Sequence, residues 1–356
     1  MSRFTFIALA LILTLANVTR AVPVNLAPGG TATSSSTLGA CCGSATPFFA
    51  SRANDGNRDG SSNSVIFHTN DPDTAAFFQV DLGANSFLDR IELFPRTNAV
   101  QNSVENFRID VFNTAGINVF SKNYLTASNT GDKTWGTTDI RNVEGSRIRL
   151  TRLDGSPSFL TFAEFEVYGQ SSPISFNLAK GAALTSSSLP GFGSQNADAI
   201  DGDINGHFFR PDTSGIGSSG PVYHTADQGA GEFLQLDLGT SQKMDYINLF
   251  SRTDGATTSQ VQLTILAADG VTTVFSQLLN LTGTDLGAAR YGQTLDLPAV
   301  DGRFVRLTTV GNEFLAFAEI EVFSQIPEPA TGVLGMLALA ALGRRGRKER
   351  AITYRA

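Results

Sequence analysis

Two copies of one small set of oxygen-bearing residues recur in this sequence and could hold a hard metal ion. In the first copy, Asp55-Gly56-Asn57 is a polar turn that offers a carboxylate and a carbonyl, Thr69 offers a hydroxyl, and Glu164 offers a second carboxylate. The matching residues of the second copy are Asp201, Thr225 and Glu319. Calcium takes six to eight oxygen ligands, so we expect a calcium site in each copy. The alternative is that both Asp-Gly pairs are ordinary β-turns and both glutamates face outward from a strand.

No arrangement of residues in the sequence is typical of an enzyme active site. There is no Gly-x-Ser-x-Gly turn, no His-Glu-x-x-His motif and no phosphate-binding glycine loop. Three histidines and two cysteines leave little room for a zinc site. His68 and His224 precede the two threonines, and because calcium disfavours imidazole we expect both to be buried structural residues. We predict that the protein is not an enzyme.

The middle of the chain is one unit written twice. Asn25-Leu-Ala returns as Asn177-Leu-Ala, and Phe77-Phe-Gln-Val-Asp-Leu-Gly returns as Phe233-Leu-Gln-Leu-Asp-Leu-Gly. The period is the length of a whole domain, which indicates a tandem pair rather than a solenoid. We place the two domains at 22–170 and 177–325, with a linker at 171–176.

Each copy alternates apolar and polar residues with period two, which predicts strands with one buried face. Clusters of Gly, Asn, Asp and Ser separate the alternating runs, and no stretch of the two copies has a helical stripe. The runs of the first copy are 77–82, 90–94, 107–112, 147–151 and 163–168. Several short strands in each domain predict an all-β fold of two tandem β-sandwiches.

Taken in order, the motifs of each copy resemble the discoidin, or coagulation factor 5/8 type C, family. The order is Asn-Leu-Ala, a Ser/Thr cluster, Asp-Gly, His-Thr, Phe-Phe-Gln-Val-Asp-Leu-Gly, Arg-Ile-Arg-Leu and Ala-Glu-Phe-Glu-Val-Tyr-Gly. The resemblance covers residues 25–169 and 177–323 and includes family 32 carbohydrate-binding modules and fucolectins. It implies a galactose-binding-like jelly roll that binds ligands through loops at one end.

The same resemblance implies a fuller calcium ligand set. To the side chains named above it adds the backbone carbonyls of Arg52, Asn57 and Ala163 in the first copy, and those of Asp198, Asp203 and Ala318 in the second. The second copy has ten more residues between Asp201 and Thr225 than the first has between Asp55 and Thr69.

For the glycan, the resemblance to fucolectins points to Arg96 and Arg252, each of which follows a Leu-Phe strand end. An arginine offers several fixed donors for paired sugar oxygens. Asn98 and Asp254 lie two residues further along the same loops. The second arginine of the fucolectin pattern is missing, which argues against fucose. The alternative is a solvated or salt-bridged arginine at a strand end.

Both ends of the chain read as export signals. Residues 1–21 have a basic start, an apolar stretch and small residues at a cleavage position, which predicts a signal peptide. Residues 326–356 contain Pro327-Glu328-Pro329, an apolar run and an Arg/Lys cluster, an order that resembles the PEP-CTERM sorting signal of Gram-negative bacteria. This resemblance implies transient anchoring in the inner membrane, cleavage by an exosortase and release to the cell surface or extracellular matrix.

The charge balance limits the partners. The chain carries 26 Lys and Arg against 33 Asp and Glu, and many of the basic residues lie at its ends. An acidic protein without a basic face is not expected to bind nucleic acid or anionic lipid. We therefore expect an exported protein whose two modules bind a glycan or exopolysaccharide, each with a structural calcium. The alternative is a structural matrix protein that binds no sugar.

Overall fold

The computed structural model describes residues 22–324 except 99–103, 105, 125–133, 154–158, 189, 192, 207–208, 212–216, 220–221, 253–257 and 282–291. The expected all-β fold of two sandwiches is confirmed, and the only helices in the described part are single 3-10 turns. No helix there is long and apolar enough to cross a membrane. Residues 21–325 form one compact unit. The predicted signal peptide and sorting tail lie outside the described residues.

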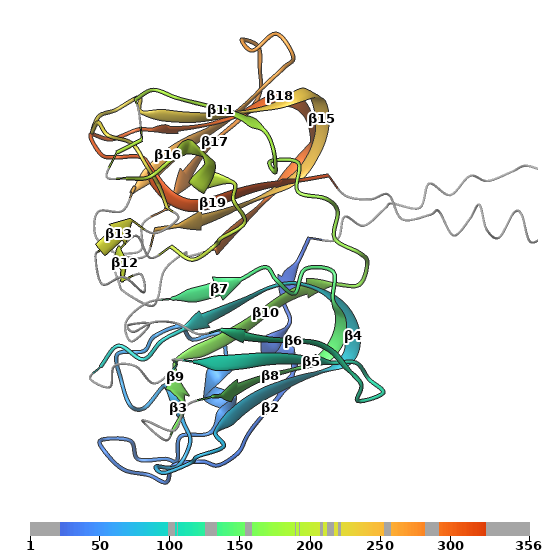
Figure 1. The fold of residues 1–356 in the computed structure, drawn as a ribbon, viewed down its shortest axis with the longest axis vertical. Coiled ribbons are helices and arrows are strands. Elements are labelled where there is room, and N and C mark those ends of the chain that lie inside the picture. Colours follow the sequence, from blue (N-terminus) through green and yellow to red (C-terminus); the bar gives the residue numbers. More distant parts are fainter. Residues whose placement is uncertain are drawn as a thin grey trace, which may run out of the picture. The chain divides into compact units, whose positions relative to one another are not determined.

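The first sandwich is built on one long strand that serves both of its layers. Its sheet order is β1-β10-β4-β8-β5-β6, and β2 and β7 also pair with β4. Figure 1 shows these elements in blue to green. Their bounds are β1 (Val24–Asn25), η1 (Ala27–Gly29), β2 (Thr31–Ser34), η2 (Ala50–Ala53), β3 (Phe67–His68), β4 (Phe77–Phe94), β5 (Phe107–Phe112), β6 (Asn118–Tyr124), β7 (Trp135–Thr137), β8 (Glu144–Arg152), β9 (Thr161–Phe162) and β10 (Glu164–Gln170).

The sequence predicts two separate strands, at 77–82 and 90–94, where the structure has the single strand β4. The first half of β4 pairs with β2 and β8, and the second half, from Phe87 to Phe94, pairs with β10. The register against β8 shifts between Asp81 and Ser86, and Gly83 has a φ of +78° there. A register shift at a glycine bends a strand without ending it. The residues that read as a turn therefore carry β4 from one layer to the other.

The second sandwich repeats this strand order in β19-β15-β18-β16-β17, with β11 beside β15 and β14 beside β19. Leu234, Leu263 and Leu307 belong to its core, as Phe78, Ile109 and Leu150 belong to that of the first sandwich. The bounds are β11 (Ala183–Ser186), η3 (Asn196–Ala199), β12 (Phe209–Pro211), β13 (Gly217–Ser219), β14 (Tyr223–His224), β15 (Phe233–Ser251), β16 (Gln260–Leu266), β17 (Thr273–Asn280), β18 (Gly292–Thr309) and β19 (Ala316–Phe323).

A buried ionic network joins the two sandwiches. Arg141 donates to Asp89 at 2.8 Å and, with both ends of its guanidinium, to Glu321 of β19 at 2.6 and 2.8 Å. Asp89 also accepts from Arg90, whose other partner is Glu92. The side chains of Asp89 and Glu321 are 0 and 1 % exposed. These charges are satisfied only while both sandwiches are present.

Arg141→Ala should destabilise the protein by about 3 kcal/mol, because it leaves the buried carboxylate of Glu321 without its cation and that of Asp89 with Arg90 alone. Thermal or urea unfolding measures the change. The matched control is Arg303→Ala, since Arg303 makes an equally short two-pronged pair with Asp237 but both side chains are partly exposed. That pair should contribute less than about 1 kcal/mol. Equal effects of the two substitutions would contradict the buried network.

Candidate functional site

The segments 55–59 and 201–205 each form a series of tight turns, which we call a turn ladder. In each ladder, an Asp or Asn side chain accepts a hydrogen bond from the backbone N–H two residues later. Asp55 Oδ1 accepts from Asn57 N at 2.8 Å, and Asn57 Oδ1 accepts from Asp59 N at 3.0 Å. In the second sandwich, Asp201 caps Asp203 and Asp203 caps Asn205 in the same way. Gly56 and Gly202 have φ values of +85° and +92°, which favours glycine at the second position of each ladder. The alternating pattern Asp-x-Asn-x-Asp-Gly was in the sequence and could have added Asp59 and Asn205 to the candidates.

Glu164 and Glu319 occupy the same buried position in the two sandwiches. Glu164 pairs with Phe94 across β10 and β4, and Glu319 pairs with Phe250 across β19 and β15. Both side chains are fully buried, so the expectation of solvent-facing glutamates is excluded. Glu164 Oε1 accepts from Gly56 N at 3.0 Å, whereas its Oε2 and both oxygens of Glu319 accept no hydrogen bond within the described residues.

The electrostatics of this position favour a cation. Burial, together with the nearby carboxylates of Glu166 and Asp55, raises the pKa of Glu164 to about 8, against the effect of the hydrogen bond from Gly56 N. Burial also raises the pKa of Glu319 well above its ordinary value, with Glu321 and Asp201 adding to the effect. Each ladder thus brings an aspartate near a buried glutamate that has unfilled acceptor positions, and this donor set fits a hard divalent ion.

The calcium sites expected from the sequence depend on more than carboxylates. Within the described residues, no three His, Cys, Asp or Glu side chains gather as a metal cluster. Backbone carbonyls, such as those the family resemblance implies at Arg52, Asn57 and Ala163, would have to complete the set. The corresponding carbonyls of the second sandwich belong to Asp198, Asp203 and Ala318.

The two threonines have other partners. The buried hydroxyl of Thr69 accepts from Leu160 N at 2.9 Å, and that of Thr225 accepts from Leu315 N at 3.0 Å. The backbone N–H groups of the same threonines donate to the carbonyls of Leu160 and Leu315. These bonds fix the segment before the last strand of each sandwich. A hydroxyl oxygen has two lone pairs, so calcium binding by Thr69 and Thr225 stays a prediction.

Arg96 is a largely buried cation held by neutral amides. It donates through Nη2 to Asn63 Oδ1 at 2.6 Å and through Nε to Asn98 Oδ1. Asn63 in turn donates to the carbonyl of Cys42. Arg96 makes no salt bridge within the described residues, in contrast to Arg58 and Arg141. Within the described residues, neither alternative, a solvated or a salt-bridged side chain, is observed.

In each sandwich the charge of the loop arginine acts on a buried histidine. Burial lowers the pKa of His68, and the nearby charge of Arg96 lowers it further. Burial and Arg252 do the same to the pKa of His224. Both histidines are buried, as predicted; each ring lies against a phenylalanine and hydrogen-bonds the following threonine carbonyl. The sequence carries one signal for this proximity, because each histidine precedes its arginine by the same 28 residues. Asp254 lies outside the described residues.

Gly60 links the Asp55 ladder to Arg96. Thr97 N donates to Gly60 O at 2.9 Å. A Cβ on Gly60 would lie 2.3 Å from Pro95 O and 2.9 Å from Thr97 N, so only glycine permits this approach. The loop that carries Asp55 therefore packs directly on the backbone that presents Arg96, and an ion that orders the loop would also order the arginine.

Gly60→Ala should displace the 95–97 backbone and weaken ligand binding by the first sandwich at least tenfold, with a lower melting temperature. The control is Gly39→Ala, because a Cβ on Gly39 meets no atom within 4 Å. Differential scanning fluorimetry and binding assays on both variants measure the effects. Unchanged stability and binding in Gly60→Ala would show that the two loops are independent.

The raised pKa of Glu164 also predicts a pH effect, because its cause is burial without a counter-ion. Between about pH 4.5 and 8 the folded metal-free protein holds a proton that the unfolded chain has lost. Its stability should therefore fall as the pH rises through that range. Calcium binds the ionised form, so the rise in melting temperature on adding calcium should be larger at pH 8 than at pH 5.5.

Glu164→Gln should reduce both the pH-dependent loss and the calcium response, whereas Glu144→Gln, at an exposed position of β8, should keep both. Scanning calorimetry in chelator and in calcium measures them. A wild-type melting temperature that calcium leaves unchanged at pH 8 would overturn the assignment.

The chain is similar to known protein families and to solved structures. Residues 52–150 match the family model of the F5/8 type C, NedA-like, galactose-binding domain. Residues 325–350 match the PEP-CTERM protein-sorting motif. No curated protein matches the chain.

Several solved structures are similar to the chain. A fucolectin from striped bass (Morone saxatilis) serum is 21% identical, with 86% of this chain and 100% of that chain covered and a TM-score of 0.36. A Streptococcus pneumoniae fucose-binding module is 23% identical, with 42% and 96% covered and a TM-score of 0.35. The family 32 module of Clostridium perfringens NanJ, solved with galactose, is 22% identical, with 41% and 99% covered and a TM-score of 0.33.

The family model matches residues 52–150, which run from η2 to β8 of the first sandwich. The chain thus contains an F5/8 type C domain of the NedA-like galactose-binding family within its first sandwich and a PEP-CTERM protein-sorting motif near its C-terminus.

Proposed function

We propose that this protein is an exported, non-catalytic glycan-binding protein whose two sandwiches each carry one binding site. The observation that carries the proposal is a largely buried arginine just after the long strand of each sandwich, Arg96 after β4 and Arg252 after β15. Arg96 is held by amide oxygens, which fix its orientation without neutralising its charge. Such a fork donates to two oxygens of an uncharged ligand at once, as neighbouring sugar hydroxyls require.

The buried glutamates support a structural calcium in each sandwich. The first ion would be held by the carboxylates of Asp55 and Glu164 and by carbonyls of Arg52, Asn57 and Ala163. The second would be held by Asp201 and Glu319 and by carbonyls of Asp198, Asp203 and Ala318. The ion would neutralise a carboxylate pair and order the loop that Gly60 packs against the Arg96 segment.

The sorting motif supports export to the surface or extracellular matrix. The family domain belongs to a carbohydrate-binding fold, and the PEP-CTERM motif spans residues 325–350. We infer that an exosortase recognises Pro327-Glu328-Pro329, that the segment after it anchors the chain transiently in the inner membrane, and that the source is a Gram-negative bacterium. Two linked sites on the released protein would raise avidity for a repeating polymer such as an exopolysaccharide.

A structural matrix protein without sugar binding is the second candidate. It is favoured by the low exposure of Arg96 and Arg252, which are 8 and 5% exposed. In that case both arginines would serve only to hold their loops.

The test is a glycan array with the purified protein, in calcium and in chelator, against Arg96→Ala plus Arg252→Ala. We expect wild-type protein to bind one sugar class in calcium and to lose at least tenfold in signal with chelator or with the double variant. The control is Arg303→Ala, which removes an arginine far from either site in sequence and held in an exposed pair. A blank array from folded wild-type protein would leave the structural matrix protein as the function.

A further inference from the structure

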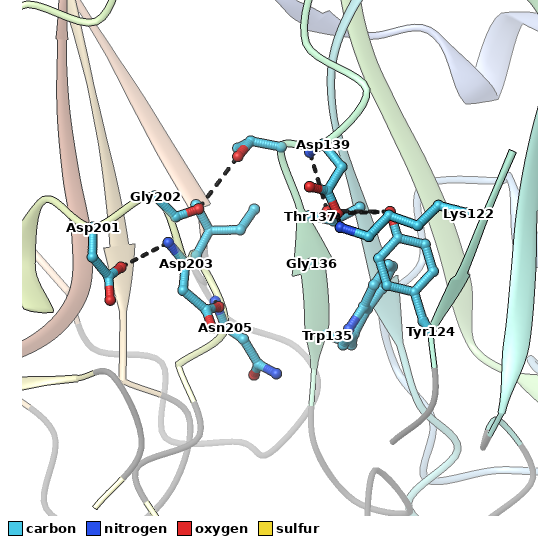
Figure 2. Close-up of a pocket in the computed structure, with 12 residues that line it drawn as sticks. Lys122, Tyr124, Trp135, Gly136, Thr137, Asp139, Asp201, Gly202, Asp203 and Asn205 are labelled. Carbon is cyan, nitrogen blue, oxygen red and sulfur yellow. Dashed lines mark hydrogen bonds and ion pairs between the residues drawn. The ribbon is translucent and has the colours of Figure 1, made fainter. Parts of the chain in front are cut away.

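A cavity of about 420 Å³ lies between the two sandwiches. Its lining includes none of Arg96, His68, Arg252 and His224. Its first wall is formed by Lys122 and Tyr124 of β6 and by residues 135–139, which make up β7 and the turn after it. Its second wall is the segment 201–205, the turn ladder of the second sandwich (Figure 2). Binding pockets for small ligands start at roughly 300 Å³, so this space can hold one or two sugar rings.

The first wall combines two aromatic rings with a polar cluster. Trp135 and Tyr124 pack edge to face with centroids 4.8 Å apart. Asp139 Oδ2 accepts from Lys122 Nζ at 2.6 Å and from Tyr124 Oη and Thr137 Oγ1 at 2.9 Å. These bonds hold the pKa of Asp139 below its ordinary value, against the effect of burial. Both rings pack into the core, since Trp135 is buried and Tyr124 stacks on Phe107. The wall therefore presents a fixed carboxylate and ammonium over two packed aromatic rings.

The second wall adds carboxylate and amide groups from the other sandwich. Asp201, Asp203 and Asn205 line the cavity, and Figure 2 shows them opposite Trp135 and Tyr124. Thr138 Oγ1 donates to Gly202 O at 3.3 Å, which ties the two walls together. A ligand in this space contacts both sandwiches at once.

The charges decide which ligands fit. The one ammonium of the lining, that of Lys122, is already paired with Asp139 at 2.6 Å. Asp203 adds a further carboxylate, while the proposed calcium would neutralise that of Asp201. Phosphates and uronic acids therefore gain no unpaired cation from the lining side chains and are disfavoured. Sugar hydroxyls both donate and accept, so a saccharide can bond to the carboxylates, the Asn205 amide and the hydroxyls of the lining.

We propose that this cavity is a third saccharide site, which takes a short neutral or amino sugar across the junction of the two sandwiches. The inference rests on the proposed function, because it assumes that the protein is a glycan binder. The third site differs from the two sites proposed above, because neither Arg96 nor Arg252 lines it.

Trp135 makes the site separately measurable, because it is the single tryptophan of the chain. Its emission is titrated with lactose, N,N′-diacetylchitobiose and chitobiose, and with digalacturonic acid as the acidic comparison. We expect a saturable change with at least one of the first three and none with digalacturonic acid. The change should persist in Arg96→Ala plus Arg252→Ala.

Lys122→Ala and Asn205→Ala each remove one polar group, from opposite walls, and each should weaken the fluorescence-detected affinity roughly three- to tenfold. The matched control is Lys180→Ala, an exposed lysine outside the lining, which should bind as wild type. Lys122 is about half exposed, so its loss should leave the fold intact.

The outcomes separate this inference from the proposed function. A positive glycan array with no change in Trp135 emission overturns the third site and leaves the proposed function standing. An emission change that disappears in the double arginine variant, or that Lys122→Ala and Asn205→Ala leave unaltered, also overturns it. A blank array together with an emission change that depends on Lys122 and Asn205 supports the junction site while the two arginine sites fail.

Discussion

The pairing of the last strand with the second half of the long strand is the constraint on which the candidate sites depend. It sets Glu164 opposite Phe94 and Glu319 opposite Phe250. Each carboxylate is thereby carried into the interior, within reach of an Asp-Gly turn ladder from more than 100 residues earlier in the chain. Burying a carboxylate without a counter-charge is costly. Glu164 and Glu319 are buried at equivalent positions of the two sandwiches. A bound cation is the simplest explanation for both.

The long strand and the last strand also carry buried charges at the junction of the sandwiches. Asp89 of β4 and Glu321 of β19 are joined through Arg141, and Arg90 of β4 pairs with Asp89. Arg90 is fully buried and its guanidinium lies 3.6 Å from the ring centroid of Tyr168 and 5.4 Å from that of Phe250 in the second sandwich. A buried ionic network contributes more to a specific arrangement than to stability in some proteins. Here it is what brings the turn ladder of the second sandwich beside β7 of the first.

Much of the fold could be predicted from the sequence, because period-two alternation and a repeated unit are local signals. The buried histidines were also predicted, because calcium disfavours imidazole and a structural role remained. The continuity of β4 was not, since Gly83 and its polar neighbours read as a turn. The burial of Glu321 and Asp89 had no local signal either, because each looks like an outward strand residue until the other sandwich covers it. Asn63 was missed as a partner of Arg96 because 33 residues separate them and no motif links the two.

Calcium stoichiometry tests the central claim most directly. Isothermal titration of calcium into chelator-treated protein, repeated near neutral pH in two buffers of different ionisation heat, counts the sites and the protons released. The account predicts two sites per chain and proton release on binding, because burial raises the pKa of Glu164 and of Glu319. No binding heat, or binding without proton release in either buffer, would contradict it.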